Sequence, residues 1–120
     1  AMARAAIKGA LQQHMDWVVV GEACNGLQAV EMFCNYEPQM TVIDFLMPEL
    51  NGLEAARRLT KRNPDIPIVM ITTDPSMQLE EEARQAGIKG VCAKDQMNCL
   101  ASAIETVMGG GTYFSKTFAA

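Results

Sequence analysis

Residues 40–52 read MTVIDFLMPELNG, and this stretch decides the fold expected for the whole chain. A short apolar, β-branched run ends at Asp44, a loop with Met47-Pro48 and Asn51-Gly52 follows, and a helical pattern begins there. This order predicts a strand that delivers a carboxylate to the carboxyl edge of a sheet, where open α/β folds bind their ligands. An Asp in this place, taken alone, is more often an ordinary strand-end residue, so its role depends on the rest of the chain.

Apolar runs at residues 17–20, 67–72 and 90–93 predict three further strands beside the one at 40–44. Helical spacing predicts one helix between successive strands, one after the last strand, and one before the first, at residues 3–15. Such an alternation specifies a parallel sheet with right-handed crossovers. We therefore expect one α/β domain of 120 residues that starts with a helix. Residues 109–120 are either the start of a linker that leads out of this domain or a frayed terminus.

Capping residues set the expected helix bounds. Asn25-Gly26 begins the second helix, Asp74-Pro75 begins the acidic helix with Pro at its first position, and Asp95 caps the last helix. The apolar face expected for the second helix consists of Leu27, Val30, Phe33 and Cys34.

Composition excludes several classes of protein. Apolar content of 49% with 20% charged residues is typical of a globular domain. No apolar run approaches the roughly 18 residues that cross a bilayer, and a signal-peptide pattern is missing, so we expect a cytoplasmic chain without a membrane partner. A net charge of −4 argues against direct nucleic-acid binding by this segment. Four cysteines without Cys-x-x-Cys spacing are expected to be small buried hydrophobes rather than zinc ligands.

Three polar residues follow three successive strands, namely Asp44, Thr72 and Lys94. Parallel strands place their carboxyl ends at one edge, so the three side chains are expected to converge there. A carboxylate can attack phosphorus to give an acyl phosphate, an ammonium neutralises the transferred group, and a hydroxyl donates a hydrogen bond to it. Singly, Thr72 is also an ordinary strand residue, and Lys94 is also an ordinary residue at a solvated sheet edge.

The pattern Asp-x-x-Met-Pro-x-x-Asn-Gly at residues 44–52 resembles the phospho-acceptor motif of bacterial response-regulator receiver domains. With average residue usage, the five fixed residues of this pattern would occur together by chance roughly once in 10⁶ starting positions. The resemblance implies a flavodoxin-like fold in which Asp44 accepts the phosphoryl group, Thr72 is the switch hydroxyl and Lys94 is the strand-five lysine. Lys94-Asp95 and the segment GGTYFS at residues 110–115 are most similar to NarL/FixJ-type regulators, in which a helix-turn-helix domain follows the receiver.

The same resemblance implies a signalling function rather than an enzyme. Asp44 would take phosphate from a histidine kinase, and the change would pass to an output domain or partner, with transcription regulation as the expected process. Mg²⁺ is the family's cofactor, and Asp44 with the backbone carbonyl of Leu46 would be its ligands here. Receivers begin with an apolar strand that ends in adjacent acidic residues, and this sequence starts after that point. We therefore expect weak Mg²⁺ binding. For the same reason we expect a homodimer or a strand-swapped oligomer instead of a conventional monomer.

Val91 is a second departure from the receiver pattern. It lies three residues before Lys94, where the family often has a Tyr or Phe that swings inward on activation. Valine cannot make that movement, so the usual aromatic readout is not expected.

Two other functions compete with the receiver. One is a truncated or phosphorylation-incompetent receiver-like module that keeps only the interaction or dimerisation surface. The other is a small phosphatase with an Asp nucleophile, which needs a second carboxylate two residues further on as general acid and base. Leu46 occupies that position, so the phosphatase is disfavoured.

Overall fold

The computed structural model describes residues 25–36, 38–46, 50–73, 76–94 and 99–114. The helix predicted at 3–15, the strand predicted at 17–20 and the cap predicted at Asp95 lie outside these residues. Within them, helices and strands alternate along the chain as the sequence predicts. The helices are α2 (Gly26–Tyr36), α3 (Gly52–Arg62), α4 (Met77–Gln85) and α5 (Leu100–Met108), and the strands are β1 (Thr41–Asp44), β2 (Ile68–Thr72) and β3 (Gly90–Ala93).

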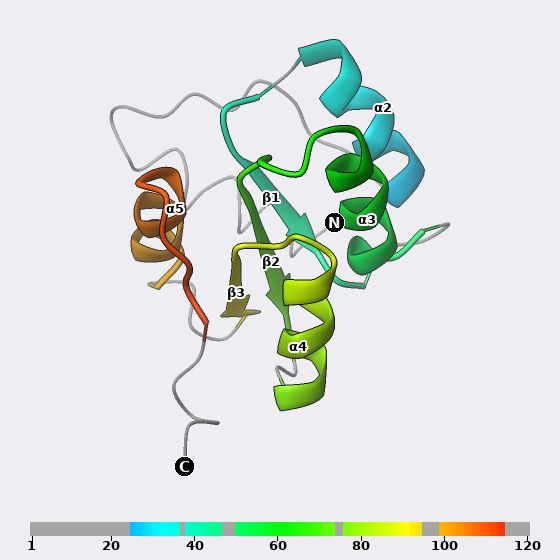
Figure 1. The fold of residues 1–120 in the computed structure, drawn as a ribbon. Coiled ribbons are helices and arrows are strands. Elements are labelled where there is room, and N and C mark those ends of the chain that lie inside the picture. The colour runs from blue at the N-terminus through cyan, green and yellow to red at the C-terminus, as the bar shows by residue number, and fades with distance from the viewer. Residues whose placement is uncertain (1–24, 37, 47–49, 74–75, 95–98, 115–120) are drawn as a thin grey trace.

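The three strands form a parallel sheet in the order β1-β2-β3, which confirms the predicted strand direction (Figure 1). β2 lies in the middle, and all five of its residues are buried. A strand buried on both faces reads as a continuous apolar run, as the sequence of residues 67–71 does. Asp44 pairs with Ile71, and Thr72 pairs with Ala93.

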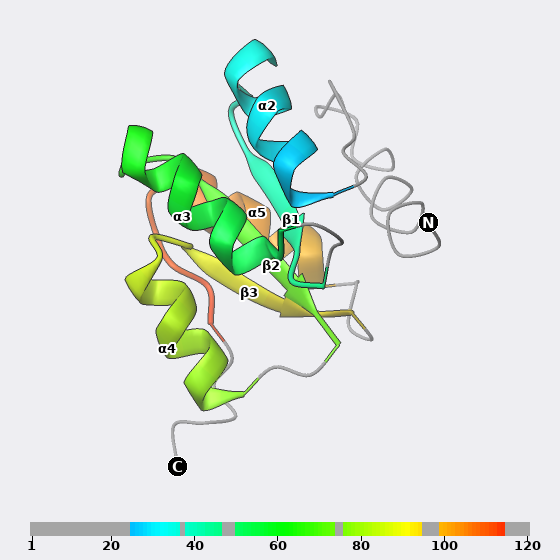
Figure 2. The same cartoon turned by 90° about the vertical axis from the view of Figure 1, so that its right-hand side faces the viewer.

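Helices cover both faces of the sheet (Figure 2). Successive side chains of a strand point to opposite faces, so β2 contributes to two cores. Ile68 and Met70 pack with buried residues of α3 and α4 on one face, and Val69 and Ile71 pack with α5 on the other. The sheet is therefore the middle layer of three, and its carboxyl edge remains as the place where polar side chains gather.

Helix α4 begins later than the sequence predicts. Its first residue is Met77, and the Ser76 side chain caps it by accepting a hydrogen bond from the Leu79 N–H at 3.0 Å. The prediction that Pro75 is the first helical residue was therefore wrong, because the Ser76 hydroxyl satisfies an N-terminal backbone donor of the helix. Asp74 and Pro75 lie outside the described residues.

Helix α2 buries fewer of its apolar side chains than expected. Its side chains Val30 and Phe33 pack against the core, whereas Leu27 is 45% exposed and Cys34 is exposed. α2 packs on α3 and lies outside the sheet layer, so among the described residues only part of its apolar face is covered (Figure 2). The predicted burial of Leu27 and Cys34 was therefore wrong, and Cys34 Sγ accepts a hydrogen bond from Arg62 at 2.7 Å.

The chain turns back after α5. Gly110 has φ +95°, a left-handed conformation that glycine adopts at little steric cost, and Tyr113 then pairs in parallel with Gly90 of β3. No helix among the described residues is both long enough and apolar enough to cross a bilayer.

Candidate functional site

The carboxyl ends of the three strands meet at one edge of the sheet. Asp44 ends β1, Thr72 ends β2, and Lys94 directly follows β3. The backbone ladder continues one residue past β1, where the Phe45 N–H donates to the Ile71 carbonyl at 2.8 Å. The register of the paired strands fixes the positions of the three residues relative to one another along the strand direction. Backbone hydrogen bonds therefore hold this edge, and not side chains alone.

Asp44 and Lys94 form an ion pair across this edge. Lys94 Nζ lies 2.8 Å from Asp44 Oδ2, and the Lys94 and Asp44 side chains are 23% and 17% exposed, respectively. The Leu46 N–H donates to the other carboxylate oxygen, Oδ1, at 3.1 Å. Both oxygens thus have a donor, which fixes the orientation of the carboxylate while part of it stays open to solvent. A charge-assisted pair at this distance is short and directional.

Thr72 ends the middle strand, whereas Asp44 and Lys94 lie at the ends of the two strands that flank it. β2 separates β1 from β3, so the contact from Asp44 to Lys94 reaches across the end of the strand that Thr72 terminates. Thr72 is 3% exposed. The structure therefore brings Asp44 and Lys94 into contact and places Thr72 at the same edge, as the sequence predicts for their positions.

Gly52 is a structural residue of the site whose role the sequence did not reveal. A Cβ built on Gly52 would lie 2.3 Å from the Asp44 carbonyl oxygen and 2.9 Å from its carbonyl carbon. The Gly52 N–H donates to the Phe45 carbonyl at 2.8 Å. The first turn of α3 thus lies directly against the backbone that carries Asp44. The only signal of this contact in the sequence is the Asn-Gly pair, which by itself indicates no more than the end of a loop.

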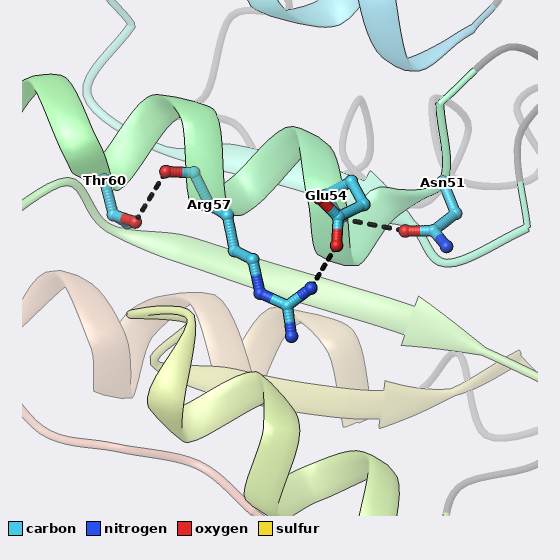
Figure 3. A network of polar contacts seen from close by, with 4 residues as sticks. All are labelled: Asn51, Glu54, Arg57 and Thr60. Atoms are coloured by element: carbon cyan, nitrogen blue, oxygen red, sulfur yellow. Dashed lines mark hydrogen bonds and ion pairs between the residues drawn. The ribbon is translucent and has the colours of Figure 1, made fainter.

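The loop between β1 and α3 is held at its far end by α2 and by a cap. A Cβ on Gly26 would lie 1.9 Å from the Leu50 carbonyl oxygen, so α2 begins in close contact with the loop. Asn51 Oδ1 accepts from the Glu54 N–H at 2.9 Å, and Glu54 is ion-paired with Arg57 (Figure 3). An Asn cap satisfies one of the orphan donors at a helix start and adds stability there. These contacts position α3, whose first turn lies against the backbone of Asp44.

Val91 is buried in β3 and pairs with Met70, in the core that α3 and α4 cover. The residue three places before Lys94 is thus part of the packed interior.

Two cysteines and a tyrosine lie on the α5 side of the sheet. Burial, and to a smaller extent the nearby Cys99, raise the pKa of Cys92 to about 11. A hydrogen bond with the Cys99 side chain and burial raise the pKa of Tyr113 above its ordinary value. Cys92 therefore stays a neutral thiol at physiological pH, as expected for a small buried hydrophobe.

The described residues do not by themselves make a complete Mg²⁺ site. No three His, Cys, Asp or Glu side chains cluster as metal ligands in the described ranges. Of the two ligands expected from the resemblance, Asp44 and the Leu46 carbonyl, only Asp44 is a carboxylate, and Lys94 already contacts it. Mg²⁺ usually takes one or two carboxylates together with water and phosphate oxygens. A complete site therefore needs ligands in addition to these two.

Known proteins resemble this chain in sequence and in fold. A family profile described as "Response regulator receiver domain" matches residues 1–105. Response regulator UvrY of Escherichia coli is 31% identical over 119 residues, which are 98% of this chain and 55% of UvrY. Transcriptional regulatory protein YdfI of Bacillus subtilis is 34% identical over 92 residues, 77% of this chain and 43% of YdfI. The chain thus spans about half the length of these relatives.

A solved structure supports the fold independently. The crystal structure of a LuxR-family two-component response regulator from an Aurantimonas species superposes with a TM-score of 0.92 at 24% identity, covering 98% of this chain and 85% of that chain. At this identity the likeness bears on the fold alone. The family profile spans more than half of the chain. The chain therefore belongs to the response regulator receiver domain family.

Proposed function

We propose that Asp44 accepts a phosphoryl group from a phosphorylated histidine of a sensor kinase. A carboxylate oxygen of Asp44 attacks the phosphorus, the P–O bond of an acyl phosphate forms, and the N–P bond of the phosphohistidine breaks. The electron pair of that bond returns to the imidazole nitrogen. Attack by water later releases inorganic phosphate and restores the carboxylate, which ends the signal.

The ion pair is the observation that carries this proposal. Lys94 Nζ at 2.8 Å from Asp44 Oδ2 lies where negative charge accumulates during transfer. Phosphoryl transfer depends mainly on positioning and on neutralising charge on the phosphoryl oxygens. Lys94 therefore supplies the neutralising charge in this proposal, and the hydroxyl of Thr72 donates a hydrogen bond to the bound phosphoryl group.

The backbone around Asp44 supports the role of acceptor. Leu46 N–H orients the carboxylate, and Gly52 allows α3 to approach it closely. Leu46 itself is 64% exposed beside this carboxylate, so an apolar side chain is available where a kinase would approach. Mg²⁺ at Asp44 and at the Leu46 carbonyl is part of the family expectation, and it needs ligands beyond those of the described residues.

The proposed partners are a histidine kinase and an output region that regulates transcription. The relatives are named as a transcriptional regulatory protein and a response regulator, which favours the receiver over a module that only mediates interactions. A net charge of −4 argues against direct nucleic-acid binding by this chain, so regulation of transcription is proposed to act through that output region. The chain itself acts as a phosphorylated switch rather than as an enzyme with a separate substrate.

Phosphoramidate with Mg²⁺ tests the acceptor role without a cognate kinase. We expect the intact mass to rise by one phosphoryl group in the parent chain and to stay unchanged in Asp44→Asn. Lys94→Met keeps the approximate length of the side chain and removes its charge, and we expect slower uptake. Lys61→Met is the matched control because it removes an exposed charge from the last turn of α3, far along the helix from its first turn.

Two results would contradict the proposal. Equal uptake by Asp44→Asn and the parent would place the acceptor elsewhere. Absence of uptake by the folded parent, with phosphoramidate and with a phosphorylated histidine kinase, would leave the interaction-only module as the better function.

A further inference from the structure

The segment after α5 lies along the outer edge of β3 and is joined to it by an isolated parallel bridge. The Tyr113 N–H donates to the Lys89 carbonyl at 2.9 Å, and the Val91 N–H donates to the Tyr113 carbonyl at 2.8 Å. These two bonds flank the parallel bridge between Gly90 and Tyr113. We call residues 111–114 the C-terminal strap.

The strap inserts one aromatic ring on each side of the sheet. Phe114 packs against the core that α3 and α4 cover, and Arg84 Cζ in the last turn of α4 lies 4.1 Å from the centroid of its ring. Tyr113 packs against the core that α5 covers, as does Cys99 at the start of that helix. The strap therefore contacts α4, β3 and α5 at the same time.

The same three elements adjoin the carboxyl edge of the sheet, where Asp44, Thr72 and Lys94 lie. α4 follows Thr72 after a short connection, Lys94 is the residue directly after β3, and Cys99 lies shortly beyond Lys94 at the start of α5. A change in the position of Lys94 relative to Asp44 thus acts on the strand and helix that hold the strap.

The strap makes few contacts with the described residues, and there is little room beneath it for a side chain at Gly90. Among the described residues, two backbone hydrogen bonds join it to the edge of β3, and a third runs from the Gly111 N–H to the Thr106 carbonyl of α5 at 3.0 Å. One cation–π contact joins it to α4, and both of its rings are only partly buried. A Cβ built on Gly90 would lie 3.1 Å from the Tyr113 carbonyl oxygen and 3.3 Å from Val107 Cγ2. Segments with few buried contacts and exposed hydrogen bonds are those that open locally. The strap is therefore expected to open more readily than the buried strands of the sheet.

We propose that the C-terminal strap is the readout element of this receiver, and that the state of the Asp44–Lys94 pair sets how firmly it is docked on β3 and α4. Val91 offers no movable ring, whereas Tyr113 and Phe114 place two rings at the same strand on a segment that can leave. The inference rests on the proposed function for the event that alters the pair.

Amide hydrogen exchange measured by NMR tests the coupling directly. The Tyr113 and Val91 amides report on the docked strap because each donates one of its two hydrogen bonds to the β3 edge. Lys94→Met and Asp44→Asn each break the ion pair, and we expect both amides to exchange about fivefold faster or more, the lower range of typical couplings between sites. Lys61→Met is the control for loss of one positive charge, with exchange unchanged.

Phe114→Ala and Gly90→Val show that the measurement detects release. Both are expected to accelerate exchange of the Tyr113 amide, the first by removing the ring under Arg84 and the second by pushing on the strap. The proposal is overturned if these two variants accelerate exchange while Lys94→Met and Asp44→Asn match the parent within about twofold.

Phosphoryl uptake is measured separately on the same samples by mass. Uptake at Asp44 without any change in strap exchange overturns this inference and leaves the proposed function in place. A second result separates the two proposals in the other direction. If Lys94→Met accelerates amide exchange of Tyr113 and Val91 but the parent chain takes up no phosphoryl group, the coupling is supported and the proposed function is contradicted.

Discussion

Replacing Gly52 with Ala tests whether α3 holds the acceptor backbone in place. The added Cβ would lie 2.3 Å from the Asp44 carbonyl oxygen, whereas ordinary contacts begin at 3.4 Å, so the helix and β1 must separate by about 1 Å. Inserting an atom into a packed contact typically costs about 1–3 kcal/mol. The better helix propensity of Ala returns up to about 1 kcal/mol, less at a first helical position.

We therefore expect Gly52→Ala to lower the free energy of unfolding by about 1–2 kcal/mol. Urea denaturation measures this change, and with a slope of about 1–3 kcal/mol per M the midpoint should fall by roughly 1 M. A displacement of about 1 Å at a reacting group can also slow a reaction by about 10²-fold, so phosphoryl uptake by Asp44 should slow more than stability alone explains.

Gly109→Ala is the matched control. Its Cβ would lie 3.5 Å from the nearest carbonyl oxygens, an ordinary contact, and its φ is −80°, which Ala adopts without strain. We expect a change in stability within about 0.5 kcal/mol. If Gly52→Ala proves as stable as the parent and takes up phosphoryl groups at the same rate, the close approach of α3 to Asp44 does not constrain the site.

Four further substitutions or measurements address other parts of the structure. Asn51→Ala removes the cap of α3 and should cost about 1 kcal/mol in urea unfolding, whereas Asn51→Asp should retain most of the stability. Thr41→Val replaces a buried hydroxyl that has no hydrogen-bond partner among the described residues, so thermal unfolding should show equal or higher stability, by up to about 1 kcal/mol. At pH 8, iodoacetamide should alkylate the exposed Cys34 well before Cys92, whose pKa of about 11 and burial keep it a protected thiol, as peptide mapping will show. As pH rises from about 8.5 toward 11, Cys92 ionises in the unfolded chain first, so the stability it contributes should fall across that range and not below it.

The three strands that the structure describes were predictable because their patterns are local. Residues 67–71 form an uninterrupted apolar run that ends at Thr72, and the structure shows β2 buried along its whole length. Asp44, Thr72 and Lys94 follow successive parallel strands, so their gathering at one edge follows from topology alone. The contact of Asp44 with Lys94 agrees with that reasoning, while the chemical roles of all three remain predictions.

The remaining features depend on contacts between segments distant in sequence. Cys34 is exposed on α2, which packs on α3, and the spacing of apolar residues in α2 does not encode its partner. The close approach at Gly52 is a distance between two backbones, for which the Asn-Gly pair gives no measure. The docking of Tyr113 beside Gly90 needs the chain to reverse at Gly110, which a run of three glycines permits without specifying.

Reductive trapping of the acyl phosphate tests the central claim most directly. Hydride reduction converts a phosphorylated aspartate to homoserine, and peptide sequencing by mass spectrometry then identifies the position. After incubation with phosphoramidate and Mg²⁺, we expect homoserine at position 44, a lower yield in Lys94→Met, and an unchanged yield in Lys61→Met. Homoserine at any other aspartate, or equal yields in Lys94→Met and the parent, would contradict an account in which Asp44 takes the phosphoryl group beside the Lys94 ammonium.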